Sequence, residues 1–167
     1  MRPSFEFHPE PRLVGGAFSV AMTVGGTELQ IVIDTGAAAA LSLSADAIAK
    51  LETCQGLEVP QKAIQTGVNG ERICSDVLSA RVQIGRTVAF DHVQVFANSE
   101  DVQGADGYAG MGLLRAVDVW LSPHEVGFRP SGRMPSKSLA LAPGSCGKRV
   151  VQCAMRATTA DAPSRKG

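Results

Sequence analysis

Asp34 is the residue whose surroundings most favour chemistry in this sequence. It follows the apolar run at residues 31–33 directly and is itself followed by Thr35 and Gly36. Because an apolar run of this kind is typical of a strand buried on both faces, the carboxylate stands where a strand leaves the core. It needs hydrogen-bond donors there, and Thr35 and the next backbone N–H groups can supply them. The pattern therefore indicates either a turn that only ends a strand or a carboxylate held for acid–base catalysis.

A hairpin before Asp34 and a short helix after it are the elements that would position it. Residues 17–24 and 27–33 are rich in β-branched and apolar side chains, and Gly25-Gly26 between them supplies the positive φ angles of a tight turn. Ser44 is a candidate N-cap for a helix over residues 45–52. We therefore expect a strand hairpin, the loop that carries Asp34, and then a helix.

The rest of the chain up to Pro130 is typical of short strands separated by turns. A second hairpin is expected over residues 64–73, with Asn69-Gly70, a strong two-residue turn signal, at its tip. The remaining expected elements are strands 77–84 and 88–97, a glycine-rich turn into a short helix at 106–115, and a closing hairpin of 117–121 and 125–128. This order predicts an all-β fold, a small closed barrel with one or two short helices.

Three segments of this sequence resemble signatures of the retropepsin-like aspartic proteases. Residues 31–37 (IVIDTGA) resemble the active-site loop of that family, and the hairpin 64–73 resembles its flap. Residues 106–115 (DGYAGMGLLR) resemble its second signature, a turn that leads into a short helix. The residues that carry these likenesses are Asp34, Thr35, Gly36 and Ala37 in the loop, Val68, Asn69 and Gly70 in the flap, and Tyr108, Ala109 and Gly110 in the turn.

The resemblance implies an aspartic endopeptidase that acts on polypeptides, with Asp34 as the catalytic carboxylate and with no metal or organic cofactor. Such enzymes use two carboxylates that share one proton. The chain has no second D-T-G or D-S-G and is too short for two lobes, so the second carboxylate must be Asp34 of another copy in a homodimer. Ala37 has no hydroxyl to donate to the carboxylate, so we expect activity at mildly acidic pH.

One alternative keeps the fold and drops the catalysis. A catalytically inactive protease-like module could serve for dimerisation, or could bind extended peptides by strand addition, because neither role needs a dyad of carboxylates. Cleavage that depends on Asp34 would separate the endopeptidase from this module.

Composition divides the chain into three parts and sets expectations for its partners. We expect an N-terminal extension at 1–11, a protease domain at 12–130 and a mostly disordered basic tail at 131–167. The formal net charge of zero combines nine basic and fifteen acidic residues up to Pro130 with seven basic and one acidic residue after it. This balance favours neither nucleic acid nor membranes as partners. The first residues lack the apolar stretch of a secretory signal, which predicts a cytoplasmic location.

The cysteines, the histidines and the tryptophan carry no motif of their own. Four cysteines without a C-x-x-C pair, in a chain expected in the cytoplasm, predict free thiols. Three scattered histidines lack the spacing of a metal site. We expect His92 to face solvent from a strand and Trp120 to pack against the body of the domain.

Overall fold

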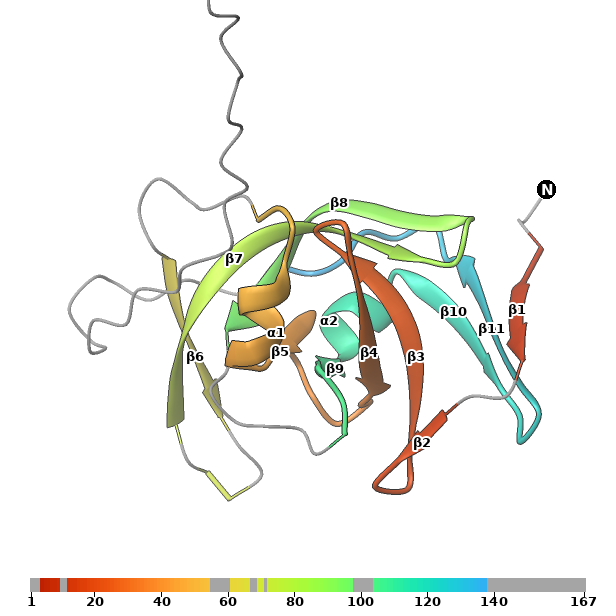
Figure 1. Cartoon of the computed structure of the whole chain (residues 1–167), viewed down its shortest axis with the longest axis horizontal. Coiled ribbons are helices and arrows are strands. Elements are labelled where there is room, and N and C mark those ends of the chain that lie inside the picture. The colour runs from red at the N-terminus through yellow and green to blue at the C-terminus, as the bar shows by residue number, and fades with distance from the viewer. Residues whose placement is uncertain are drawn as a thin grey trace, which may run out of the picture.

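The computed structural model describes residues 4–9, 12–54, 61–66, 69–70, 72–97 and 104–137. This part of the chain forms eleven strands and two short helices (Figure 1). The strands are β1 (Glu6–Pro9), β2 (Arg12–Val14), β3 (Ala17–Val24), β4 (Thr27–Ile33), β5 (Leu41–Leu43), β6 (Gln61–Thr66), β7 (Arg72–Ile84), β8 (Val88–Ala97), β9 (Gly107–Ala109), β10 (Val117–Leu121) and β11 (Glu125–Pro130). The helices are α1 (Ala45–Lys50) and α2 (Met111–Leu114). The all-β prediction with one or two short helices is confirmed.

Eight of the strands form one sheet that closes on itself. Its order is β2-β3-β4-β9-β5-β8-β7-β6, and a further pairing joins β3 to β7, with Val24 opposite Val82. The other three strands form a smaller sheet in the order β1-β11-β10, which lies to the right of the barrel in Figure 1. The barrel-like closure expected from the sequence is therefore confirmed.

The β3–β4 hairpin forms where the glycine pair predicted it. Gly25 has φ 54° and Gly26 has φ 84°, and a type I′ turn needs positive φ at both central positions. Met22 of β3 is 1% exposed and points into the core, as the alternation along that strand predicts. At the end of β4, Ile31 and Val32 are both buried, at 0% and 8% exposure. Strand β4 thus carries the chain out of the core directly into Asp34.

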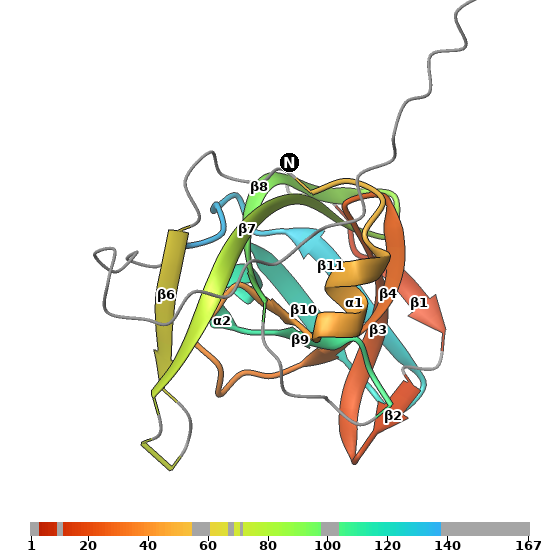
Figure 2. The ribbon, with the colours of Figure 1, turned by 60° about the vertical axis from the view of Figure 1, so that its left-hand side comes forward.

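Helix α1 begins at the predicted cap. The hydroxyl of Ser44 accepts a hydrogen bond from the backbone N–H of Ala47 at 3.1 Å, the usual N-cap geometry. The helix ends two residues before the predicted end because Leu51 has an extended backbone, with φ −60° and ψ 128°. Ile48 and Leu51 are buried in the core, and the backbone N–H of Thr53 donates to the carbonyl of Gly25 at 2.9 Å. These contacts place α1 beside β4, as Figure 2 shows.

Residues 6–9, inside the expected N-terminal extension, form a strand of the smaller sheet. Strand β1 pairs with β11, with Glu6 opposite Phe128. The carboxylate of Glu6 accepts hydrogen bonds from the backbone N–H groups of Arg86 and Thr87 at 2.9 Å and from the Thr87 hydroxyl at 2.8 Å. The Thr87 hydroxyl, and after it the Arg86 backbone N–H, lower the pKa of Glu6 below its ordinary value. Glu6 therefore ties the start of the chain to the β7–β8 turn.

The prediction of free thiols is wrong for Cys54 and Cys74, which are both disulfide-bonded. Cys146 and Cys153 lie outside the described residues. The prediction failed because sequence spacing does not report which cysteines come together in space. Disulfides form and persist mainly in oxidising compartments, so they do not favour the cytoplasmic location, which stays a prediction.

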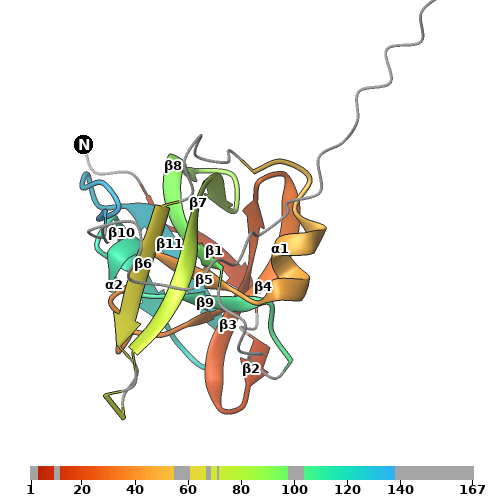
Figure 3. The same cartoon turned by 90° about the vertical axis from the view of Figure 1, so that its left-hand side faces the viewer.

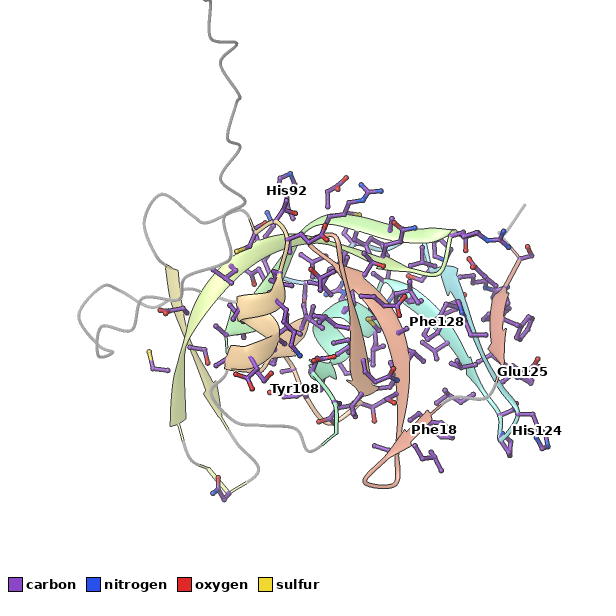
Figure 4. The ribbon with its side chains drawn as sticks, in the orientation of Figure 1. Phe18, His92, Tyr108, His124, Glu125 and Phe128 are labelled. Carbon is purple, nitrogen blue, oxygen red and sulfur yellow. The ribbon has the colours of Figure 1, made fainter. Side chains whose placement is uncertain are left out.

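The expected packing of Trp120 is also wrong, whereas the expectation for His92 is confirmed. Trp120 is 54% exposed, because it lies on the outer face of the smaller sheet and not on the face toward the barrel. His92 is exposed on β8 and points away from the body of the molecule (Figure 4). Its φ of 56° accompanies a bulge, since two residues of β8 stand opposite Arg81 of β7.

The first residues of the expected tail return along α2. The backbone N–H of Ser131 donates to the carbonyl of Ala116 at 2.9 Å, and the N–H of Ser136 donates to the carbonyl of Gly112 at 2.7 Å. Residues 138–167, which make up most of the expected tail, lie outside the described residues. The proposed limits of the three parts of the chain stay predictions.

Candidate active site

Strand β4 delivers Asp34 to the surface with its backbone fixed. The backbone N–H of Asp34 donates to the carbonyl of Ala109 at 2.9 Å, which extends the pairing of β4 with β9 by one residue. The side chain of Asp34 is exposed, and its Oδ1 accepts a hydrogen bond from the backbone N–H of Gly36 at 2.9 Å. The N–H of Ala37 donates to the carbonyl of Asp34 at 3.3 Å and closes the turn. The donors expected from the sequence are thus partly confirmed, because the one supplied to the carboxylate is Gly36.

Strand β9 pairs with the strands on either side of the loop that carries Asp34. It lies between β4, with which it runs parallel, and β5, with which it runs antiparallel. Ala109 is therefore opposite Ile33 on one side and opposite Leu41 on the other. Tyr108, the middle residue of β9, is labelled in Figure 4. The second signature recognised in the sequence thus packs directly against the two ends of the loop that carries Asp34.

Three glycines let these backbones approach one another. A Cβ atom at Gly110 would stand 2.5 Å from the carbonyl oxygens of both Ala37 and Ala39. One at Gly112 would stand 2.6 Å from the backbone nitrogen of Ala40, and one at Gly107 would meet the carbonyl of Ser42 more closely still. Every one of these neighbours is a backbone atom, so no side-chain rotation could relieve the clash.

Helix α2 fixes the far side of the loop. The backbone N–H of Met111 donates to the carbonyl of Ala37 at 2.7 Å, and that of Gly110 donates to the carbonyl of Ala40 at 3.2 Å. The sequence prediction included Gly110 but not the glycines on either side of it, Gly107 and Gly112. Their spacing around Gly110 was the signal that could have identified them.

The hairpin of β6 and β7 stands where the sequence predicted a flap. Strands Gln61–Thr66 and Arg72–Ile84 pair antiparallel, with Thr66 opposite Arg72. Asn69 and Gly70 are exposed at the turn, and Gly70 has the positive φ of 81° that favours glycine. Val68, the third flap residue predicted from the sequence, lies outside the described residues. The hairpin extends from the barrel at the lower left of Figure 1.

The acidic residues nearest in sequence to the second signature serve structural pairs. Asp106 accepts a hydrogen bond from the backbone N–H of Gln30 at 2.8 Å and lies 3.4 Å from the Lys50 ammonium group. Asp118 pairs with the Arg129 guanidinium at 2.7 Å. Asp34 is therefore the carboxylate that the turn after β4 presents to solvent.

The described residues hold no group of three or more His, Cys, Asp or Glu side chains that could bind a metal ion. Within the same ranges, neither helix is long and apolar enough to cross a membrane.

The closed barrel, the turn at Asp34 and the glycine-rich turn before α2 together define the retropepsin-like fold of aspartic proteases. A retropepsin-like aspartic protease from Rickettsia conorii has a similar structure, with a TM-score of 0.56 and 18% sequence identity over 76% of this chain and 92% of that one. The EIAV protease in complex with the inhibitor HBY-793 is also similar, with a TM-score of 0.42 and 20% identity over 59% of this chain and 86% of that one. No family model matches the sequence, and no curated protein does. The predicted fold is confirmed by the first of these structures.

Proposed function

We propose that this chain is an aspartic endopeptidase that works as a homodimer. The observation that carries the proposal is the exposed carboxylate of Asp34, held at the end of a buried strand by backbone hydrogen bonds with Ala109 of β9 and with Gly36 and Ala37 of its own turn. A turn that only ended a strand would not need the glycine contacts that fix this loop between β9 and α2. Such rigidity is expected where reacting groups must be held in place.

The chemistry requires a second carboxylate about 3 Å from the first, because only at such a distance do two acids share one proton. The ionised carboxylate would accept a proton from a water molecule held between the two, and that water would attack the peptide carbonyl. The protonated carboxylate would donate to the carbonyl oxygen, so that the charge formed in the transition state is stabilised. Since one chain presents one Asp34, a two-fold axis must bring two copies together at this loop.

The remaining site residues have supporting roles in this proposal. Thr35 and Gly36 are exposed beside Asp34, where the partner's loop would approach. Thr35 would hydrogen-bond to that loop, and Gly36 would let the two backbones come close. Asn69 and Gly70 would lie at the tip of a flap that covers an extended polypeptide substrate. The substrate class is polypeptide, and no cofactor takes part in the proposed reaction.

Replacement of Asp34 by asparagine tests the proposal. Asp34→Asn keeps the size and the acceptor at Oδ1 but cannot act as a base, so we expect cleavage of an unfolded protein substrate to disappear. Asp91→Asn is the matched control, because Asp91 is an exposed carboxylate on β8 that forms an ion pair with Arg81 at 2.7 Å, away from the loop. Retention of cleavage in Asp34→Asn would refute the assignment. Absence of pepstatin-sensitive cleavage by the natural sequence between about pH 3 and pH 7 would favour the inactive module.

The pH dependence gives a second test. Ala37 offers no hydroxyl to the carboxylate, so the ionised form of the pair lacks one stabilising donor. We expect the rate maximum at mildly acidic pH, and a maximum as low as about pH 2 would contradict this expectation.

A further inference from the structure

Cys54 and Cys74 are both disulfide-bonded, and they lie on different parts of the fold. Cys54 follows α1 and packs half-buried against the core, whereas Cys74 is exposed on β7, opposite Ile64 of β6. A disulfide joins cysteines whose Cα atoms lie within about 7 Å of each other. Whether Cys54 and Cys74 can bond to each other therefore depends on the distance that the strands set between them.

Backbone hydrogen bonds place Cys54 toward the other end of β7 from Cys74. The N–H of Thr53 donates to the carbonyl of Gly25 at 2.9 Å, and the N–H of Gly25 donates to the carbonyl of Arg81 at 2.9 Å. Cys54 is therefore three short steps from Arg81, and together these steps cover at most about 15 Å. Along β7, Arg81 and Cys74 are seven residues apart, which is about 23 Å at a rise of about 3.3 Å per residue.

A bond between Cys54 and Cys74 does not fit this geometry. Even if all three steps pointed toward Cys74, about 8 Å would remain between the two Cα atoms, which is more than a disulfide spans. Figure 3 shows the same separation of the elements that carry them, with α1 on the right of the molecule and the β6–β7 hairpin on the left. Each of the two cysteines therefore needs a different partner.

The chain has four cysteines, and the other two, Cys146 and Cys153, lie outside the described residues in the expected tail. We propose that Cys54 and Cys74 each bond to one of these two, in either assignment. The two bonds, the tail cross-links, then join the tail to the barrel at two places. The seven residue steps from Cys146 to Cys153 reach about 25 Å when extended, enough for the distance along β7 between the two bonds.

The described start of the tail lies on the side of the molecule that carries the hairpin. The N–H of Ser136 donates to the carbonyl of Gly112 at 2.7 Å, so the chain after β11 follows α2. The loop beside α2 reaches β7, because Ala39 packs with Val77, three residues from Cys74. In Figure 3, α2 and the β6–β7 hairpin both lie on the left. A tail that starts at α2 is therefore placed to meet Cys74.

Cys74 is located where the hairpin leaves the barrel. Asp76 is 7% exposed and is the last residue of β7, toward the tip, that has a partner in β8, where it lies opposite Ala97. Beyond Asp76, β7 pairs with β6 alone among the described strands. Cys74 is exposed two positions farther along. A disulfide at Cys74 therefore joins the tail to the part of the hairpin that the barrel does not hold.

The cross-link at Cys74 makes the hairpin sensitive to a dithiol reductant. One thiolate of the reductant attacks a sulfur of the protein disulfide and forms a mixed disulfide, and its second thiol then closes the reductant's own disulfide. Two electrons and two protons pass to the protein, which gains two thiols. This consequence rests on the proposed function, because a flap must open to admit a polypeptide. The oxidised chain should therefore cleave more slowly than the reduced chain.

Disulfide mapping of the whole, unreduced chain by mass spectrometry tests the pairing. Trypsin cuts after lysine and arginine, so it places each cysteine in a different peptide: 51–62, 73–81, 138–148 and 150–156. We expect the first two peptides each to be linked to one of the last two. A link between the first two would overturn the proposal. Disulfides between two copies, seen as a covalent dimer on a non-reducing gel, would also overturn it.

Hydrogen exchange tests whether the cross-link restrains the hairpin, and it needs no cleavage. Reduction and alkylation of the whole chain should speed amide exchange in residues 61–66 and 72–76 at least about tenfold, while β3 and β4 stay protected. Cys74→Ser should show the fast exchange without reductant. Cys54→Ser is the matched control, because it breaks only the cross-link outside the hairpin and should keep the slow exchange. Equal exchange in the oxidised and reduced chains would overturn the restraint.

Cleavage rates test the consequence and separate it from the proposed function. If the open hairpin is about a tenth as populated in the oxidised chain, reduction should raise kcat/KM about tenfold. Cys74→Ser should cleave at the reduced rate throughout, whereas Cys54→Ser should still respond to the dithiol. The mapped cross-links and faster exchange without any cleavage would retain this inference and refute the endopeptidase. Cleavage that depends on Asp34 but does not change on reduction would retain the endopeptidase and refute the restraint.

Discussion

Gly110→Ala is the substitution that most directly tests how the active-site loop is held. The new Cβ atom would stand 2.5 Å from the carbonyl oxygens of Ala37 and Ala39, where an ordinary contact starts at 3.4 Å. One or both backbone segments must therefore move by about 0.9 Å. Overpacking of this kind costs typically 1–3 kcal/mol, and contact with two backbone carbonyls places this case near the upper end, at about 3 kcal/mol. For a domain of this size that corresponds to a melting temperature lower by about 6–12 °C.

The loss of activity should exceed the loss of stability. The carbonyl of Ala37 accepts the Met111 hydrogen bond, and the N–H of Ala37 donates to the carbonyl of Asp34, so a shift of Ala37 moves the backbone of the proposed catalytic residue. A displacement near 1 Å can reduce kcat about a hundredfold. The assay combines thermal unfolding by circular dichroism with kcat measured well below the melting temperature of the variant.

Gly132→Ala is the matched control for this prediction. A Cβ atom there meets nothing within 4 Å, but Gly132 has φ 83°, so alanine brings backbone strain without a clash. It should cost about 1 kcal/mol and leave kcat unchanged. If Gly110→Ala melts no lower than this control and cleaves at the natural rate, close packing does not hold the loop.

Three further predictions concern parts of the fold away from the loop. Glu6→Gln removes a charged acceptor of three hydrogen bonds and should lower the free energy of unfolding by about 1–2 kcal/mol at neutral pH. Because the pKa of Glu6 is lowered in the fold, its contribution is present above the ordinary glutamate pKa and is lost as the pH falls. Denaturant unfolding should therefore show a smaller difference in stability between the variant and the natural sequence at acid pH than at neutral pH. His92→Gly should stabilise the fold by up to about 1 kcal/mol, because glycine accepts the φ of 56° without strain, whereas a β-branched valine there should destabilise it, and equal melting temperatures for both variants would contradict this explanation. Cys54 and Cys74 should resist alkylation in the denatured, unreduced chain and react after reduction, as peptide mass spectrometry can measure; labelling before reduction would contradict the disulfides.

Local signals in the sequence predict the elements that depend on neighbouring residues. The Gly25-Gly26 turn and the Ser44 cap each act over a few residues, so their outcome follows from residue type. The same holds for the apolar end of β4 that leads to Asp34. The part of the site that these elements build could therefore be predicted without knowledge of the whole fold.

Contacts between distant segments could not be predicted in this way. Strand β9 is three residues long, and its place between β4 and β5 is set by pairing with residues far away in the sequence. The hydrogen bonds that Thr87 donates to Glu6 and the disulfides at Cys54 and Cys74 depend in the same way on which segments meet. Trp120 faces solvent because the three-stranded sheet stands beside the barrel, a matter of sheet arrangement that its strand sequence does not determine.

The run of alanines at residues 38–40, after Asp34, is explained by the close packing of this loop against α2. The absence of a polar side chain at residues 38–40 is unusual for a loop beside a proposed substrate site, yet Ala39 and Ala40 are only 8% and 2% exposed. Ala39 packs with Val77 and Phe96, and Ala40 lies against Gly112 of α2. A Cβ atom at Gly112 would already stand 2.8 Å from the Cα of Ala40, so the backbones are too close for larger side chains to fit between them. In the proposed dimer the two loops are related by a two-fold axis, so any displacement of the loop occurs in both copies. The distance between the two Asp34 carboxylates then changes by the sum of both movements. The proposed pair of carboxylates must be held at a fixed distance, and small residues on both sides of this contact allow the close packing that fixes it.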